Sequence, residues 1–95
     1  MQNDEEVANA QKELKGELFV YNYQYRRLTS DFEGKLAELM FKADSNNLEK
    51  LAKAFPEEAE AVKSYYKVDG WWDECQDKVE AYFESYTEYL KKRWL

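Results

Sequence analysis

The stretch WWDECQDKVEAYFESYTEYL, residues 71–90, shows the clearest helical spacing in the chain. Its apolar residues recur at steps of three and four, and this spacing places them on one face of an α-helix: Trp72, Cys75, Val79, Tyr82, Phe83, Tyr86 and Leu90. Lys91, Lys92 and Arg93 follow, where the helix dipole favours cations. The pattern predicts a long helix from about Trp71 to Arg93.

The first half of the chain carries a similar pattern, at steps of seven, four and three: Val7, Leu14, Leu18, Tyr21, Tyr25, Leu28 and Phe32. It predicts a long helix over residues 4–43, kinked or broken near Thr29. Thr29 and Ser30 are poor interior helix formers, and Ser30 with Glu33 matches a capping box. Alternating aromatic residues also admit a strand at residues 18–25, although the sequence offers no second strand to pair with it.

Two short helices are expected between the long ones. Asn46 with Glu49 resembles a helix start, and Pro56 suits the first position of the next helix. The sequence therefore predicts an all-α fold in one domain, residues 1–95, with two long amphipathic helices flanking a short helical pair. Nothing else in the chain can cover an unbroken first helix, so a helical-bundle homo-oligomer is expected.

The composition argues against an enzyme. The chain has no histidine, which removes the commonest metal ligand and the usual general base. The glycines Gly16, Gly34 and Gly70 are isolated, so there is no glycine-rich phosphate loop. Cys75 lies on the apolar stripe and is interpreted as a buried structural thiol. We therefore expect no catalytic residues, no metal site and no cofactor.

Charge and hydropathy limit the partners and the cellular compartment that we expect for this chain. The net charge of −6 argues against direct nucleic-acid binding. No apolar run approaches the roughly 20 residues that a membrane-spanning helix needs, so no membrane contact is expected. The N-terminus is polar and acidic, unlike a signal peptide, and a lone cysteine fits a reducing compartment. These features predict a cytoplasmic protein.

One surface of the last helix stands out by its charge. Five carboxylates fall at steps of four, three, four and four, opposite the apolar stripe: Asp73, Asp77, Glu80, Glu84 and Glu88. We call them the acidic stripe. As a plain solvated face it would keep the chain soluble. Alternatively, it imitates a row of phosphates and binds a protein partner, such as a host protein, with a basic surface.

Two further candidates combine aromatic and cationic residues. A ridge of Phe19, Tyr23, Arg26 and Arg27 lies beside the first apolar seam, either as the edge of a wide buried face or as a site for a small nucleotide. Trp71 is either a clamp on the short helices or an exposed anchor for a partner.

One part of the chain has a recognisable likeness, carried by Lys42-Ala43-Asp44, Asn47-Leu48-Glu49-Lys50-Leu51, Ala54-Phe55-Pro56-Glu57, Tyr66 and Gly70-Trp71-Trp72. This part resembles short uncharacterised proteins encoded by phages and other mobile elements. The resemblance implies a context in which small acidic helical proteins inhibit host machinery, such as host defence.

Three classes of function therefore remain open. The first is an inhibitor or adaptor that acts by protein–protein interaction. The second is an oligomer that sequesters a small nucleotide through Tyr, Phe and Arg side chains. The third is a structural protein that assembles only with copies of itself.

Overall fold

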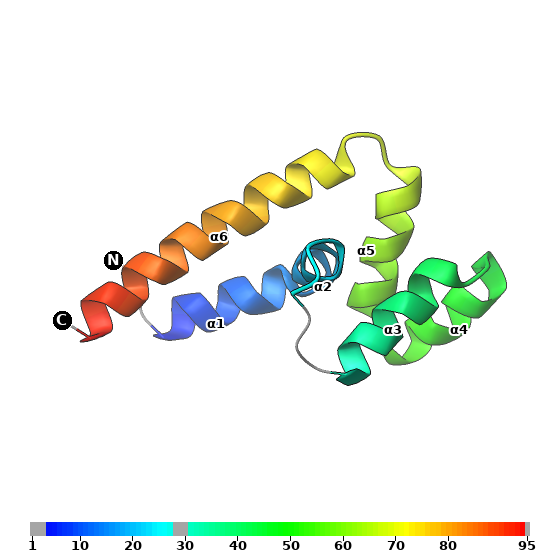
Figure 1. The fold of residues 1–95 in the computed structure, drawn as a ribbon, viewed down its shortest axis with the longest axis horizontal. Helices are drawn as coiled ribbons and strands as arrows, with labels where there is room; N and C mark the ends of the chain where they lie inside the picture. The colour runs from blue at the N-terminus through cyan, green and yellow to red at the C-terminus, as the bar shows by residue number, and fades with distance from the viewer. Residues whose placement is uncertain (1–3, 28–30, 95) are drawn as a thin grey trace.

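The computed structural model describes residues 4–27 and 31–94, with side chains described to residue 92. The regular elements of these residues are all α-helices (Figure 1): α1 (Asp4–Glu13), α2 (Lys15–Gln24), α3 (Asp31–Lys42), α4 (Ser45–Ala54), α5 (Pro56–Lys67) and α6 (Trp71–Trp94). The predicted all-α fold is confirmed. The alternative strand at residues 18–25 is wrong, because these residues lie in α2 and at its C-cap. The predicted last helix corresponds to α6.

The first long helix is divided, and its first bend was not predicted. Leu14 separates α1 from α2 with φ −100° and ψ 17°. Backbone hydrogen bonds still span the bend, since Leu14 N–H donates to Ala10 and Leu18 N–H donates to Leu14. Figure 1 nevertheless shows α2 running in a different direction from α1. The apolar spacing hides this bend, because Leu14 itself fits the helical period.

The second break begins at Tyr25, earlier than the predicted position at Thr29, which lies outside the described residues. Arg26 adopts a left-handed conformation with φ 56°. Its N–H donates to the Tyr23 carbonyl at 3.1 Å, and the next N–H, of Arg27, donates to Asn22 at 2.6 Å. These two bonds form a Schellman motif, which ends α2.

A glycine at the position of Arg26 should stabilise the chain. Side chains with a Cβ pay roughly 1 kcal/mol or more in the left-handed region, and the Arg26 side chain is exposed. We expect Arg26→Gly to raise the free energy of unfolding in urea by about 1 kcal/mol and Arg26→Val to lower it. Equal stability of the two variants would contradict the assigned conformation.

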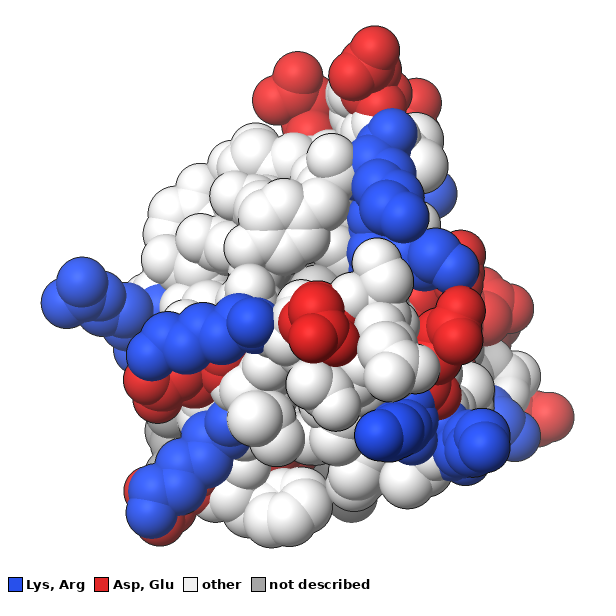
Figure 2. Space-filling view, turned by 90° about the vertical axis from the view of Figure 1, so that its right-hand side faces the viewer, with Lys and Arg blue, Asp and Glu red and all other residues white. Residues whose placement is uncertain are grey.

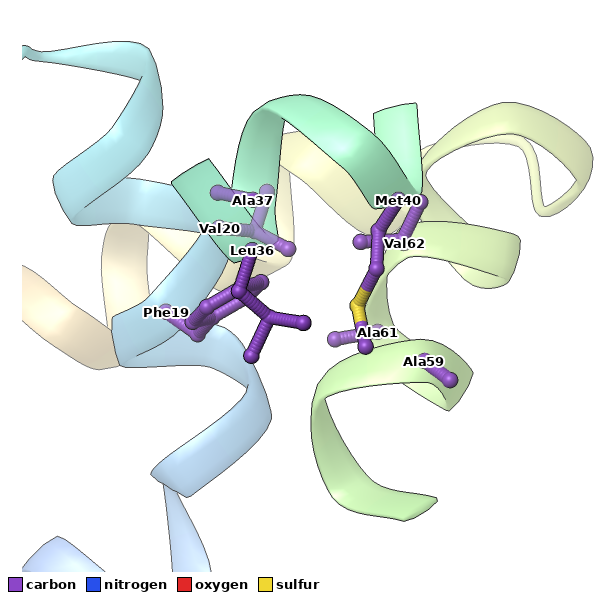
Figure 3. Packing of buried hydrophobic residues seen from close by; sticks show 8 residues of the cluster. All are labelled: Phe19, Val20, Leu36, Ala37, Met40, Ala59, Ala61 and Val62. Atoms are coloured by element: carbon purple, nitrogen blue, oxygen red, sulfur yellow. The ribbon is translucent and has the colours of Figure 1, made fainter. Parts of the chain in front are cut away.

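The main core lies where α2, α3 and α5 meet (Figure 3). Eight buried residues form it: Phe19, Val20, Leu36, Ala37, Met40, Ala59, Ala61 and Val62. Small residues on α5 let α2 approach closely. A Cβ on Gly16 would lie only 2.5 Å from the Glu57 carbonyl oxygen and 2.9 Å from the Ala61 Cβ. Gly16 is therefore required by the crossing of α2 and α5.

A second, smaller core joins α2 to α6. Tyr21 packs there with Cys75 and Val79, which are 1% and 0% exposed. Adjacent residues of α2, Val20 and Tyr21, thus face the two cores. This arrangement makes α2 the central helix of the fold, with α6 on one side and the α3–α5 group on the other (Figure 1).

Capping residues set the starts of α4 and α5, and the structure corrects one of the two predicted starts. The N-cap of α4 is Asp44 and not Asn46, because the Asp44 carboxylate accepts a hydrogen bond from the Asn47 N–H at 2.8 Å. Pro56 occupies the start of α5 as expected. Gly70, with φ +79°, closes the turn before α6.

Several large apolar side chains remain on the surface. Phe32 is 64% exposed and Leu39 is 55% exposed, both on α3. The expected homo-oligomer would cover such residues, and it stays a prediction. Within residues 4–27 and 31–94, no helix combines the length and the hydropathy that crossing a membrane requires.

Candidate functional site

The acidic stripe occupies the outer face of α6. All five of its residues are exposed. The opposite face of this helix carries Cys75 and Val79, which are buried against Tyr21 of α2. The stripe is therefore fixed on a rigid helix that runs along one edge of the molecule (Figure 1).

The charges of the stripe are not neutralised locally. None of its carboxylates forms an ion pair with any residue that the structure describes. Lys78 is the only cation between Asp69 and Glu88 in the sequence. Like charges three or four residues apart destabilise a helix by a few tenths of a kcal/mol per pair. The stripe therefore weakens α6 slightly and leaves a strong negative field beside it.

Cys75 is held on the buried side of the same helix. Its Sγ lies 3.5 Å from the Glu17 carbonyl oxygen, to which it can donate a weak hydrogen bond. Burial, reinforced by the nearby Glu17 carboxylate, raises the pKa of the thiol to about 12. The thiol is thus protonated at neutral pH, and a protonated thiol is a poor nucleophile. Its role here is packing, as the sequence predicted.

The predicted ridge does not form one exposed surface. Phe19 is 7% exposed and belongs to the main core. Tyr23 is half-buried and stacks on Phe41 of α3, with ring centroids 4.9 Å apart. Because both rings contact the interior, neither is free to stack on a nucleotide in this conformation of a single chain. Their helical spacing marked a wide buried face, which is the other interpretation that the sequence allowed.

Arg26 and Arg27 are exposed, but they do not form the predicted ridge with Phe19 and Tyr23. Arg26 shapes the end of α2 through its backbone. The Arg27 guanidinium lies 5.9 Å from each of three ring centroids, those of Tyr21, Tyr25 and Phe83. These cation–π contacts join the end of α2 to α6. The sequence did not predict this cluster, because Phe83 is far from α2 along the chain.

Trp71 is half-buried at the start of α6. It packs against both core clusters, beside Trp72. Trp71 thus packs between the α3–α5 group and the α2–α6 contact, which is the clamp that the sequence allowed. The alternative, that Trp71 anchors a partner, stays a prediction, because Trp71 is only half-buried.

The α3–α5 end of the molecule differs from the stripe in its charge. Figure 2 shows uncharged areas there, separated by cations and anions of both signs. A groove of about 410 Å³ lies between α4 and α5, with an apolar lining that includes Leu48, Ala52 and Tyr66. Its charged edges balance, because Glu49 and Glu60 oppose two lysines. This end therefore has no electrostatic preference comparable to that of the stripe.

A metal centre finds no support in the described part of the chain, where no group of three or more Cys, Asp or Glu side chains is placed to hold an ion. Comparison of the chain with protein-family models, with curated proteins and with solved structures finds no match.

Proposed function

We propose that this protein is a binding protein, an inhibitor or adaptor that recognises a basic surface on a protein partner through the acidic stripe. One observation carries the proposal: five exposed carboxylates follow one face of α6 with no cation paired to them among the described residues. Such a row destabilises its own helix because the carboxylates repel one another. A basic partner would offset this repulsion, since its cations attract the same carboxylates.

The spacing of the stripe suggests what kind of basic surface it fits. Successive carboxylates are three or four residues apart, which is about 4.5–6 Å along a helix. This spacing is wider than the axial spacing of phosphates in one DNA strand, about 3.4 Å, so the stripe resembles a phosphate row in its sign and regular repeat and not in its exact spacing. From Asp73 to Glu88 the stripe extends roughly 22 Å. A groove that normally holds a nucleic-acid strand is therefore the partner surface that we propose, and inhibition of a host protein is the proposed context.

Charge reversal on the stripe tests this function. The variant Asp77→Lys, Glu80→Lys and Glu84→Lys should weaken binding to the partner by about tenfold or more, because complementary charges become repulsive. The partner is first captured with the wild-type chain at low salt and purified, and binding is then measured by calorimetry. We also expect wild-type binding to weaken as salt is raised and a nucleic acid to compete with it.

A matched control separates the stripe from net charge alone. The variant Glu13→Lys, Glu49→Lys and Glu60→Lys alters exposed residues outside the stripe. Both triple variants change the net charge from −6 to 0, since each substitution adds two positive charges. The control should keep most of the affinity. Equal weakening by the two variants would reduce the stripe to a general solubilising charge and reject the proposal.

A further inference from the structure

The groove of about 410 Å³ between α4 and α5 is bordered by one face of α5. Small side chains of both helices line it, Ala52 from α4 and Ala59 from α5. The lining residues of α5 recur at steps of three and four, as on a helix face that packs against another helix: Pro56, Ala59, Glu60, Lys63, Tyr66 and Lys67. All of them except Ala59 are exposed, so the described part of the chain leaves this α5 face uncovered.

Tyr66 is the aromatic residue of the α5 face. It is 62% exposed, yet its position is fixed. Its hydroxyl donates a hydrogen bond to the Phe41 carbonyl oxygen at 3.1 Å, and its ring meets the Phe41 ring edge-on, with centroids 5.7 Å apart. A side chain that is already held in one position loses little conformational freedom when a partner covers it. Tyrosine is also a frequent anchor of protein interfaces. Tyr66 therefore marks the α5 face as a contact surface.

The charges along the α5 face decide what kind of partner fits it. Glu60 and Lys67 lie about two turns apart on α5, roughly 10 Å along the helix axis. Neither they nor Glu49 and Lys63, which also border the groove, form an ion pair with any residue that the structure describes. A partner surface of one sign would attract one end of this row and repel the other. A complementary surface must carry the same two charges in the reverse order.

We propose that the α5 face binds the same face of a second copy of the chain, with the two α5 helices antiparallel. A two-fold axis reverses the order of the charges, so Glu60 of each copy lies beside Lys67 of the other. Lys63 lies near the axis, and its long side chain can carry the charge outward to water. The Tyr66 ring of each copy then covers the small residues around Ala59 of the other. The contact is complete with two copies and builds no filament.

Complementary charge variants of the full chain test this arrangement. We expect the wild type to dimerise reversibly in sedimentation equilibrium over a dilution series. Glu60→Lys and Lys67→Glu should each weaken the dimer by about tenfold or more, because symmetry makes each substitution turn two attractive pairs repulsive. An equimolar mixture of the two variants should form a heterodimer, since each of its pairs again joins a lysine to a glutamate. This rescue distinguishes the proposed pairing from a loss of folding.

Matched controls lie outside the α5 face. Glu13→Lys and Lys53→Glu make the same changes of charge at exposed positions that do not border the groove, and they should leave the dimer unchanged. Tyr66→Ala should weaken the dimer, and Tyr66→Phe, which keeps the ring, should weaken it less. A wild type that stays monomeric at every concentration would overturn the inference. A dimer that survives both charge reversals, or a mixture that does not associate, would overturn it as well.

The dimer and the acidic stripe can fail separately, because they use different helices. The triple stripe variant leaves α5 unchanged and should remain dimeric. The net-charge control of the stripe carries Glu60→Lys and should be monomeric, yet each of its chains keeps an intact stripe for the basic partner. A stripe variant that became monomeric would place the contact between copies on α6 and contradict the inference.

Discussion

Gly16→Ala is expected to lower the free energy of unfolding by about 2 kcal/mol, although alanine favours helices more than glycine does. The added methyl group would lie 2.5 Å from the Glu57 carbonyl oxygen and 2.9 Å from the Ala61 Cβ. A backbone atom cannot rotate away as a side chain can, so α2 and α5 must move apart. Because the main core spans these helices, the separation would also loosen its packing. Urea unfolding, followed by circular dichroism, measures the loss.

The chain contains its own control for this prediction. A Cβ on Gly34, within α3, would meet no atom within 4 Å. Gly34→Ala should therefore raise the free energy of unfolding by about 0.5–1 kcal/mol through helix propensity alone. Adding Ala61→Gly to Gly16→Ala removes the contact with the Ala61 Cβ but not the one with the Glu57 carbonyl, and it costs about 1 kcal/mol in helix propensity, so we expect no net rescue. Equal effects of alanine at Gly16 and Gly34 would contradict the close crossing of α2 and α5.

The helices could be predicted from the sequence because their signals are local. The apolar spacing around Val79 and the position of Pro56 depend on residues within a few turns. The bend at Leu14 could not be read in this way. It serves the crossing of α2 over α5, and that contact is made with residues more than 40 positions later in the chain. Gly16, a glycine inside a helical pattern, was the one local signal for it.

The candidate site was also predictable only where its signals are local to one helix. The stripe is a local property of one helix, and its exposure follows from burial of Cys75 and Val79 on the other side. The ridge was misjudged as a surface because a single helix face does not reveal which neighbours cover it. Tyr23 is half-buried because Phe41 of α3 stacks on it. A small cavity lined by Leu18, Phe19 and Glu58 could not be predicted from any one helix, since four helices must meet to form it.

Met40→Ala is expected to have the largest effect of the substitutions considered, a loss of about 3 kcal/mol in the free energy of unfolding. Met40 is 1% exposed and is among the largest fully buried side chains. Figure 3 shows it extending from α3 alongside Val62 and Ala61 of α5. Removing the Met40 side chain leaves a cavity that its neighbours cannot fill, because Ala59 and Ala61 carry only methyl groups. For a chain of this size, such a loss is a large share of the total stability.

The adjacent residue distinguishes core packing from an effect on helix α3. Leu39 lies next to Met40 but is 55% exposed, and Leu39→Ala changes helix propensity about as little as Met40→Ala does. Leu39→Ala should therefore shift the urea midpoint only slightly, with the slope of the transition unchanged. Met40→Leu nearly conserves volume and should lose less than about 1.5 kcal/mol. If Leu39→Ala instead destabilised the chain as much as Met40→Ala, the exposed side of α3 would have to be buried in solution. The assembly of several copies expected from the sequence would then be the simplest way to bury it.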